Sequence, residues 1–181
     1  IYKEILNEVH GVILSDYAKG MFLSEKFCME IIDEAKKRGK FIFVDPKSVD
    51  WGKYRSATAI TPNFKEFKAT AFKENLPVDN LEEASKALIK KYDLSFLVVT
   101  LGKNGIFFYH PEEGSHYLPA QAKEVYDVSG AGDTVVASLS AFYSIGLSVK
   151  HSLILANIAA GIVVGKVGTK PVYCCLLYTS D

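Results

Sequence analysis

Short apolar runs alternate along the chain with longer amphipathic segments. The apolar runs have the length of buried strands and end in polar residues; they lie at 12–14, 41–44, 59–60 and 96–99. Between them, apolar residues recur every three or four positions, as in helices packed on one side; these segments are 24–38, 64–71 and 80–91. Ser24 is a suitable N-cap for the first helix, and Gly39 a suitable residue just past its end. Strands and helices in this order predict a parallel sheet covered by helices.

The pattern changes in the second half of the chain. Two more short strands, at 106–109 and 116–118, are joined by the turn sequence Pro-Glu-Glu-Gly, which predicts antiparallel additions to the sheet. Two helices follow, at 132–145 and 149–164. The 181 residues contain no internal repeat and suit one domain. The sequence therefore predicts one α/β domain with a mostly parallel central sheet.

The composition mainly argues against several classes of protein, such as nucleic-acid-binding and membrane proteins. Lys+Arg and Asp+Glu both number 21, so no net field attracts nucleic acid or an anionic membrane. No apolar run approaches the roughly 18–20 residues of a membrane span. Three cysteines make no disulfide framework, which favours the cytoplasm, and Cys28 is expected to be a small buried hydrophobe. The four histidines have no ligand spacing, so they predict no metal site.

Polar residues follow several of the predicted strands. In open α/β sheets, ligands bind beyond the carboxyl ends of the strands. The residues found there are Ser15 with Asp16, Asp45, Asn63 with Glu66, and the Thr100–Gly102 segment. Asn63 and Glu66 also have the spacing of a capping box, an arrangement that would start a helix whether or not they bind a ligand.

The segment Asp127–Thr134 carries the sharpest chemical signal. Gly130, Ala131 and Gly132 have almost no side chain, and a helix is predicted directly after them. Such backbone can direct several N–H groups at an anion, and the helix N-terminus adds positive partial charge. Asp133 would then lie beside the bound anion, well placed to deprotonate an attacking hydroxyl. Composition alone leaves open the alternative that Asp133 only caps a helix.

The segment Asp-Val-Ser-Gly-Ala-Gly-Asp-Thr resembles the C-terminal signature of the ribokinase-like (PfkB-type) carbohydrate kinases. That family usually has Thr-Thr before Gly-Ala-Gly-Asp, and Val128 departs from this pattern. Three further segments are similar to family motifs in the same order: Thr61–Glu66, Thr100–Gly105 and Ala156–Gly161. The resemblance covers residues 9 to 172 and implies the family's three-layer α/β/α fold.

The resemblance also implies roles for individual residues. Asp133 would be the catalytic base and a substrate contact, and Glu66 would act on Mg²⁺ through water. Both Asp16 and Lys19 would bind the substrate: Asp16 would hold sugar hydroxyls, and Lys19 or Lys47 would meet the substrate's phosphate. Asp127 would lie near a monovalent-cation site that takes K⁺. The remaining ATP-binding residues would be Asn63, Phe64, Lys65, Glu66, Thr100, Gly102, Gly105, Gly130, Ala131, Gly132 and Asn157.

Within the family, several segments are most similar to the heptose-7-phosphate kinases, which in many bacteria are fused to an adenylyltransferase. These segments are Ser15–Gly20, Val44–Lys47, Glu124–Val128 and Gly161–Thr169. The resemblance implies phosphoryl transfer from ATP to the anomeric hydroxyl of a heptose 7-phosphate, for lipopolysaccharide synthesis, by a homodimer. Two alternatives stay open: another acceptor (ribose, fructose, fructose phosphate or a nucleoside), or an inactive nucleotide-binding piece.

The two ends of the chain are unusual. Ile1 is not an initiator Met, and Cys175–Asp181 resembles translated sequencing-adapter sequence. We therefore expect residues 1–174 to be the C-terminal, nucleotide-binding part of one kinase domain, and 175–181 to be a non-native tail. The family's N-terminal strands and lid would then be missing, and the chain alone would be inactive.

Overall fold

The computed structural model describes residues 1–121, 127–166, 168 and 171–172. The expected tail at 175–181 and part of the Glu124–Val128 segment lie outside these residues. The chain forms two compact units, each described by itself below. Unit 1 consists of residues 1–100 and 107–116, and unit 2 of residues 101–106 and 117–181.

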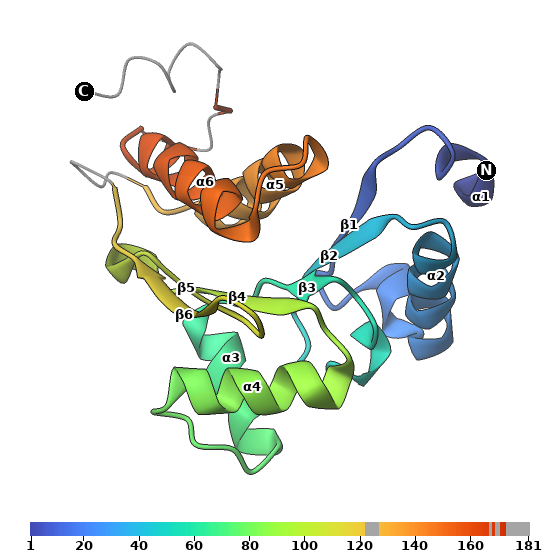
Figure 1. The fold of residues 1–181 in the computed structure, drawn as a ribbon, viewed down its shortest axis with the longest axis horizontal. Coiled ribbons are helices and arrows are strands. Elements are labelled where there is room, and N and C mark those ends of the chain that lie inside the picture. Colours follow the sequence, from blue (N-terminus) through green and yellow to red (C-terminus); the bar gives the residue numbers. More distant parts are fainter. Residues whose placement is uncertain (122–126, 167, 169–170, 173–181) are drawn as a thin grey trace. The chain divides into compact units, whose positions relative to one another are not determined.

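One six-stranded sheet has its strands in sequence order (Figure 1). The strands are β1 (Gly11–Ser15), β2 (Phe41–Asp45), β3 (Ala59–Ile60), β4 (Phe96–Thr100), β5 (Ile106–His110) and β6 (Gly114–Leu118). β1 to β4 pair in parallel, for example with Ser15 opposite Asp45 and Val44 opposite Ile60. The connections after β4 and β5 are too short for a parallel crossover, so β5 and β6 run antiparallel to their neighbours. The predicted sheet is confirmed.

The helices of unit 1 connect consecutive parallel strands. Right-handed crossovers between strands in sequence order all lie on one face of a sheet. These connections contain α2 (Glu25–Lys37), α3 (Phe64–Lys73) and α4 (Leu81–Tyr92), with the short 3-10 helices η1 (Gly20–Leu23) and η2 (Gly52–Tyr54). α2 begins at Ser24, whose hydroxyl accepts the N–H of Phe27, and Gly39 beyond its end has a φ of +65°. The short α1 (Tyr2–Ile5) and the 3-10 helices were not predicted.

The core of unit 1 fills the space around β2 and β4. Phe43, Phe96 and Leu97 are fully buried, and the rings of Phe43 and Phe96 meet edge to face with centroids 5.7 Å apart. Cys28 on α2 is buried as predicted. β1 is different because it is the first strand of the sheet and Ile13 is 41% exposed.

Unit 2 contains two packed helices, α5 (Ala131–Ser144) and α6 (Val149–Val164). A short turn joins them, with Gly146 at a φ of +88°, so they run antiparallel. Ser148 caps α6 by accepting the N–H of His151. Unit 2 also contains the 3-10 helix η3 (Gly102–Asn104).

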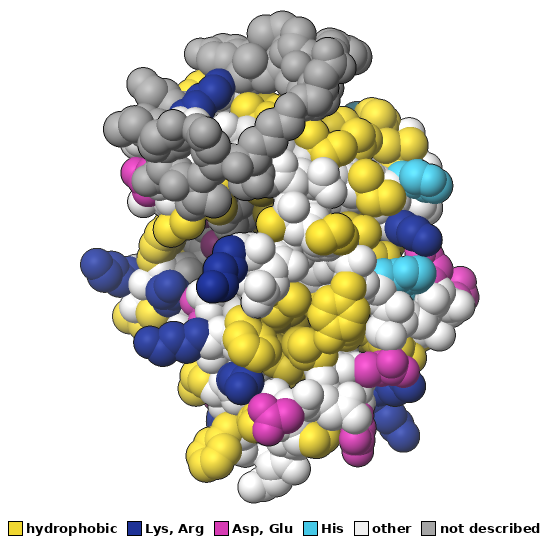
Figure 2. All heavy atoms as spheres, turned by 90° about the vertical axis from the view of Figure 1, so that its left-hand side faces the viewer, with side chains coloured by type: hydrophobic (Ala, Val, Ile, Leu, Met, Phe, Trp, Pro, Cys, Tyr) yellow, Lys and Arg dark blue, Asp and Glu magenta, His cyan; other side chains and the backbone are white. Residues whose placement is uncertain are grey.

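The surface carries charges of both signs. Figure 2 shows basic and acidic side chains on the same face, with hydrophobic side chains between them. Within the part of the chain that the structure describes, no helix is long and apolar enough to cross a membrane.

Candidate functional site

The carboxyl end of β3 leads into a capping box at the start of α3. The side-chain oxygen of Asn63 accepts the N–H of Glu66, and Oε2 of Glu66 accepts the N–H of Asn63, each at 2.9 Å. Asn63 also forms an isolated parallel bridge with Thr100, which places the ends of β3 and β4 side by side. The sequence left open whether this pair caps a helix or binds a ligand. The cap is present, and it fixes both side chains at the edge where ligands bind in such sheets.

Lys47, in the loop after β2, forms an ion pair with Glu66. Its Nζ lies 3.1 Å from Oε1 of Glu66. The hydrogen bond and charge of Glu66 raise the pKa of Lys47, so its ammonium is charged at neutral pH. Both oxygens of the Glu66 carboxylate are therefore in contact with donors of the same unit.

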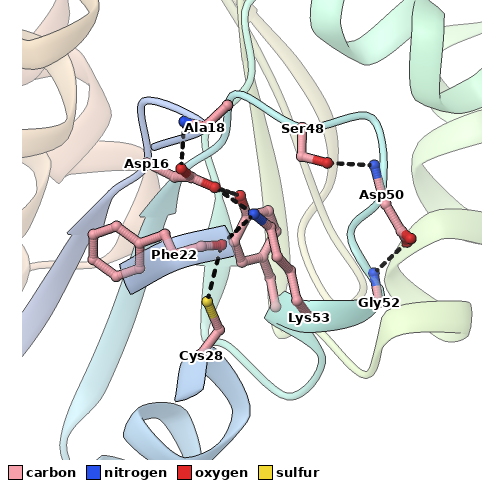
Figure 3. Close-up of polar contacts among 9 residues, drawn as sticks. Asp16, Ala18, Phe22, Cys28, Ser48, Asp50, Gly52 and Lys53 are labelled. Atoms are coloured by element: carbon pink, nitrogen blue, oxygen red, sulfur yellow. Dashed lines mark hydrogen bonds and ion pairs between the residues drawn. The ribbon is translucent and has the colours of Figure 1, made fainter. Parts of the chain in front are cut away.

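Asp16, just after β1, is the centre of a buried polar cluster (Figure 3). Its Oδ2 accepts from Nζ of Lys53 at 2.6 Å and from the hydroxyl of Tyr54, and its Oδ1 accepts the N–H of Ala18 at 2.6 Å. Lys53 also donates to the carbonyl of Phe22 at 2.8 Å. Burial raises the pKa of Asp16, but these donors outweigh burial and leave the pKa below its ordinary value. Burial and the Asp16 charge raise the pKa of Tyr54, which stays a phenol.

This cluster fixes the loop that carries Lys19. Ala18 has a φ of +55°, a left-handed conformation that is unusual for a residue with a side chain. The bond from its N–H to Asp16 holds that conformation in place. Tyr17 and Lys19 are exposed on either side of it. A sugar hydroxyl would have to compete with Lys53 and Tyr54 for Asp16, whereas Lys19 faces solvent; both substrate contacts stay predictions.

The turn after β4 contains two glycines with different environments. Gly102 has a φ of +59°, and a Cβ added there would meet no atom within 4 Å. Gly105 has a φ of +93°, and a Cβ there would overlap the backbone of the 118–120 segment. The carbonyl of Gly105 accepts the N–H of Leu101 at 2.8 Å. Gly105 therefore has a packing role that the motif did not reveal, while the space over Gly102 is open.

The start of α5 is the segment where the sequence analysis predicts an anion site. Gly130 is the N-cap residue with a φ of +79°, and Asp133 lies exposed in the first turn. The N–H of Ala131 donates to the carbonyl of Val128, but within the described residues nothing accepts from the N–H groups of Gly132 and Asp133. Among the described residues, a Cβ added at Gly132 would meet no atom within 4 Å outside its chain neighbours and its own helical backbone. Free N–H groups, open space and a carboxylate thus occur together at this helix start.

Two other candidate ligand-binding side chains of unit 2, those of Asp127 and Asn157, form hydrogen bonds within the protein. Oδ1 of Asp127 accepts the N–H of Ser129 at 2.8 Å, and hydrogen bonding from Ser129 lowers the pKa of Asp127. The Asn157 side chain is buried in α6 and donates to the carbonyl of Pro119 at 2.6 Å. Asn157 thereby fixes the segment after β6. The expected roles of Asp127 with K⁺ and of Asn157 with nucleotide stay predictions.

Within unit 1, the structure brings together predicted residues from several strand ends, and it adds Lys53 and Tyr54, which the sequence analysis missed. The available signal was weak: Lys53 lies between Trp51 and Tyr54, both fully buried, in a segment without helical or strand periodicity. The described residues contain no group of three or more His, Cys, Asp or Glu side chains that could hold a metal. Magnesium bound through one carboxylate and substrate phosphates needs no such group. A partly exposed carboxylate such as that of Glu66 is an oxygen ligand of the kind that magnesium can bind through water, so the expected role of Glu66 stays a prediction.

The family model and the curated relatives place the chain in the same protein family. The family model described as pfkB family carbohydrate kinase matches residues 13–173. The chain is 43% identical over 173 residues to the Bifunctional protein HldE of Methylococcus capsulatus, covering 94% of this chain and 35% of that protein. It is 46% identical over 160 residues to the protein of the same name from Magnetococcus marinus, covering 88% and 33%. The chain thus spans about a third of the length of these relatives.

Solved structures show the same fold at lower identity. The Arabidopsis thaliana ribokinase complexed with ribose and ATP has a TM-score of 0.82 at 22% identity, covering 99% of this chain and 58% of that one. Phosphofructokinase-2 from Escherichia coli in complex with potassium has a TM-score of 0.81 at 18% identity, covering 97% and 58%. These likenesses establish a ribokinase-like fold.

Proposed function

Because the chain belongs to the pfkB family of carbohydrate kinases, we propose that it carries the nucleotide-binding and base-bearing part of an ATP-dependent sugar kinase. The acceptor that its motifs favour is a heptose 7-phosphate, phosphorylated at the anomeric hydroxyl. The observation that carries the proposal is the start of α5, where Asp133 is exposed next to N–H groups that have no acceptor among the described residues. The cytoplasm, where ATP and reduced cysteines occur, is the proposed location.

Asp133 acts as the general base in this proposal. It takes the proton of the acceptor hydroxyl while that oxygen bonds to the γ-phosphorus of ATP, and the bond from this phosphorus to the bridging oxygen breaks to release ADP. The N–H groups of Gly132 and Asp133 donate to the transferred group as its charge shifts. One such donor contributes about 3–4 kcal/mol in other enzymes. Gly130 allows this arrangement because its left-handed φ turns the chain into the helix.

Unit 1 supplies the groups for the metal and the substrate. Magnesium, when bound, neutralises charge on the nucleotide phosphates. Glu66 would bind it through water and Asn63 would hold the phosphates, with the capping box keeping both side chains in place. Lys19 would meet the phosphate of the substrate from the loop that Asp16 holds. Asp127 remains the proposed contact for K⁺.

The test is Asp133→Asn, which keeps size and polarity but removes the base. Activity is measured in a hybrid in which the preceding segment of the Methylococcus capsulatus relative is joined to this chain. We expect kcat to fall by about 100- to 10,000-fold, while calorimetry shows near-normal binding of a non-hydrolysable ATP analogue. Near-normal turnover of the variant would exclude Asp133 as the base. Absence of analogue binding to the unchanged chain would reject the nucleotide site itself.

A further inference from the structure

The loop after β2 lies in register along one face of α3. Three contacts connect them: Lys47 with Glu66 at 3.1 Å, the carbonyl of Val49 with the hydroxyl of Thr70 at 3.3 Å, and Asp50 with Lys73 at 3.2 Å. Positions 66, 70 and 73 follow the spacing of one helix face. The backbone that carries Lys47 is therefore attached to the same helix that carries Glu66.

The loop is also held internally. The N–H of Asp50 donates to the hydroxyl of Ser48 at 3.0 Å, and the N–H of Gly52 donates to Oδ1 of Asp50 at 3.1 Å (Figure 3). The side chain of Lys47 is nevertheless 56% exposed, whereas that of Glu66 is only 16% exposed. The ammonium can thus swing into solvent without moving the loop, but Glu66 cannot leave its cap so easily.

The ammonium occupies the side of Glu66 that a cation would approach. Oε2 of Glu66 is committed to the N–H of Asn63, so Oε1, in contact with Lys47, is the oxygen left for a metal or its water. Two cations at one oxygen repel each other. A single charge about 5 Å from a divalent ion in water changes its affinity by on the order of tenfold before screening by salt.

We infer that Lys47 is an internal cation that holds Glu66 in the nucleotide-free protein and leaves it when a divalent metal binds. Lys47 is a positioning residue in this role, because it acts through Glu66. The inference rests on the proposed function, since it takes Glu66 as the metal-binding group. In this role, Lys47 lowers the affinity of the Glu66 carboxylate for the divalent metal.

The experiment titrates Mn²⁺ alone into the 181-residue chain and measures free Mn²⁺ by electron paramagnetic resonance. We expect Lys47→Met and Lys47→Gln to bind Mn²⁺ roughly three- to tenfold more tightly than the unchanged chain. Lys47→Arg, which keeps the charge, should stay within about twofold. Lys86→Met removes a surface lysine paired with Glu82 on α4 and should leave the affinity unchanged.

A pair of variants separates this role from a purely structural one. In Glu66→Gln the metal group is lost, so adding Lys47→Met to it should give no further tightening. The inference is overturned if both uncharged variants bind Mn²⁺ no more tightly than the unchanged chain, or if the gain persists without Glu66. The proposed function is tested separately, by calorimetry with the ATP analogue. If the analogue does not bind, the proposed function fails, whatever the result of the Mn²⁺ titration.

Discussion

The ammonium of Lys53 lies 2.6 Å from the carboxylate of Asp16, and the two side chains are only 11% and 0% exposed. Lys53 comes from η2 and Asp16 directly follows β1, so the pair connects segments that are distant in sequence. Tyr54 and the N–H of Ala18 complete the hydrogen bonds of the carboxylate. A buried ion pair without such additional partners would be costly.

Replacing Lys53 by Met should destabilise the protein by about 3–5 kcal/mol near neutral pH, because it leaves a buried carboxylate without its cation. Asp16 has a pKa below its ordinary value in the folded protein. Its contribution to stability is therefore present above the unfolded carboxyl pKa of about 4 and is lost as the pH falls through the lower, folded pKa. The loss in Lys53→Met should accordingly be larger at about pH 7 than at about pH 4. Urea unfolding at both pH values measures it.

The matched control for this prediction is Lys86→Met, because Lys86 pairs with Glu82 on the exposed surface of α4. That variant should leave the free energy of unfolding nearly unchanged. A Lys53→Met protein as stable as the control, or equally weakened at both pH values, would contradict the role assigned to the Asp16 pair.

Gly132→Ala should separate nucleotide binding from stability. Beyond its own helical turn, the added Cβ meets no atom of the described residues within 4 Å. The free energy of unfolding should therefore be unchanged or slightly raised, since Ala favours a helix. The methyl group would, however, cover the free N–H groups at the start of α5. Affinity for a non-hydrolysable ATP analogue should fall on the order of tenfold, the loss of one hydrogen bond to a charged group. Unchanged affinity in calorimetry would show that no phosphate binds there.

Gly105→Ala should have the opposite effect, lowering stability directly. Its φ of +93° and the close backbone of the 118–120 segment leave no room for a side chain. Strain of this kind costs about 1–3 kcal/mol, and the overlap with backbone adds to it. Gly102→Ala is the control, since it shares a positive φ but has open space. Urea unfolding should show the larger loss for Gly105→Ala; equal losses would exclude close packing as the reason for this glycine.

The sequence predicted those features that depend on local pattern. Hydrophobic periodicity predicted the strands and the main helices. Capping chemistry predicted the cap formed by Asn63 and Glu66, and the position of the α5 start placed Asp133 in the first turn of that helix. The partners of Asp16 could not be predicted in the same way. Lys53 and Tyr54 lie 37 and 38 positions away in the sequence, and only folding brings them to β1.

A similar limit applies to residues whose role depends on distant backbone. The sequence places Gly105 in a nucleotide-binding motif. In the structure, the backbone of the 118–120 segment lies so close to Gly105 that no side chain fits there. Asn157 reads as a nucleotide contact, but its amide holds the carbonyl of Pro119. Motif position alone therefore does not separate a ligand contact from a residue that supports the contact.

The open edge of β1 should cause association of the chain. Among the described residues, β1 pairs only with β2, and Ile13 is 41% exposed. An unpaired strand with apolar side chains invites pairing with another copy. Ile13→Lys should therefore lower the sedimentation coefficient at high protein concentration, whereas Ile145→Lys, at an exposed position beyond the end of α5, should not. A concentration-independent monomer for the unchanged chain would contradict this prediction.

The chain by itself should bind ATP but transfer no phosphoryl group to a sugar. It covers 58% of the ribokinase chain that it resembles, and we propose that most contacts to the acceptor come from the part of a kinase domain that this chain does not cover. Residues 1–174 should bind a non-hydrolysable ATP analogue in calorimetry, yet release ADP no faster when heptose 7-phosphate is added. The hybrid with the preceding segment of the Methylococcus capsulatus relative serves as the positive control. An active monomer of residues 1–174 would show that these residues already contain the acceptor site.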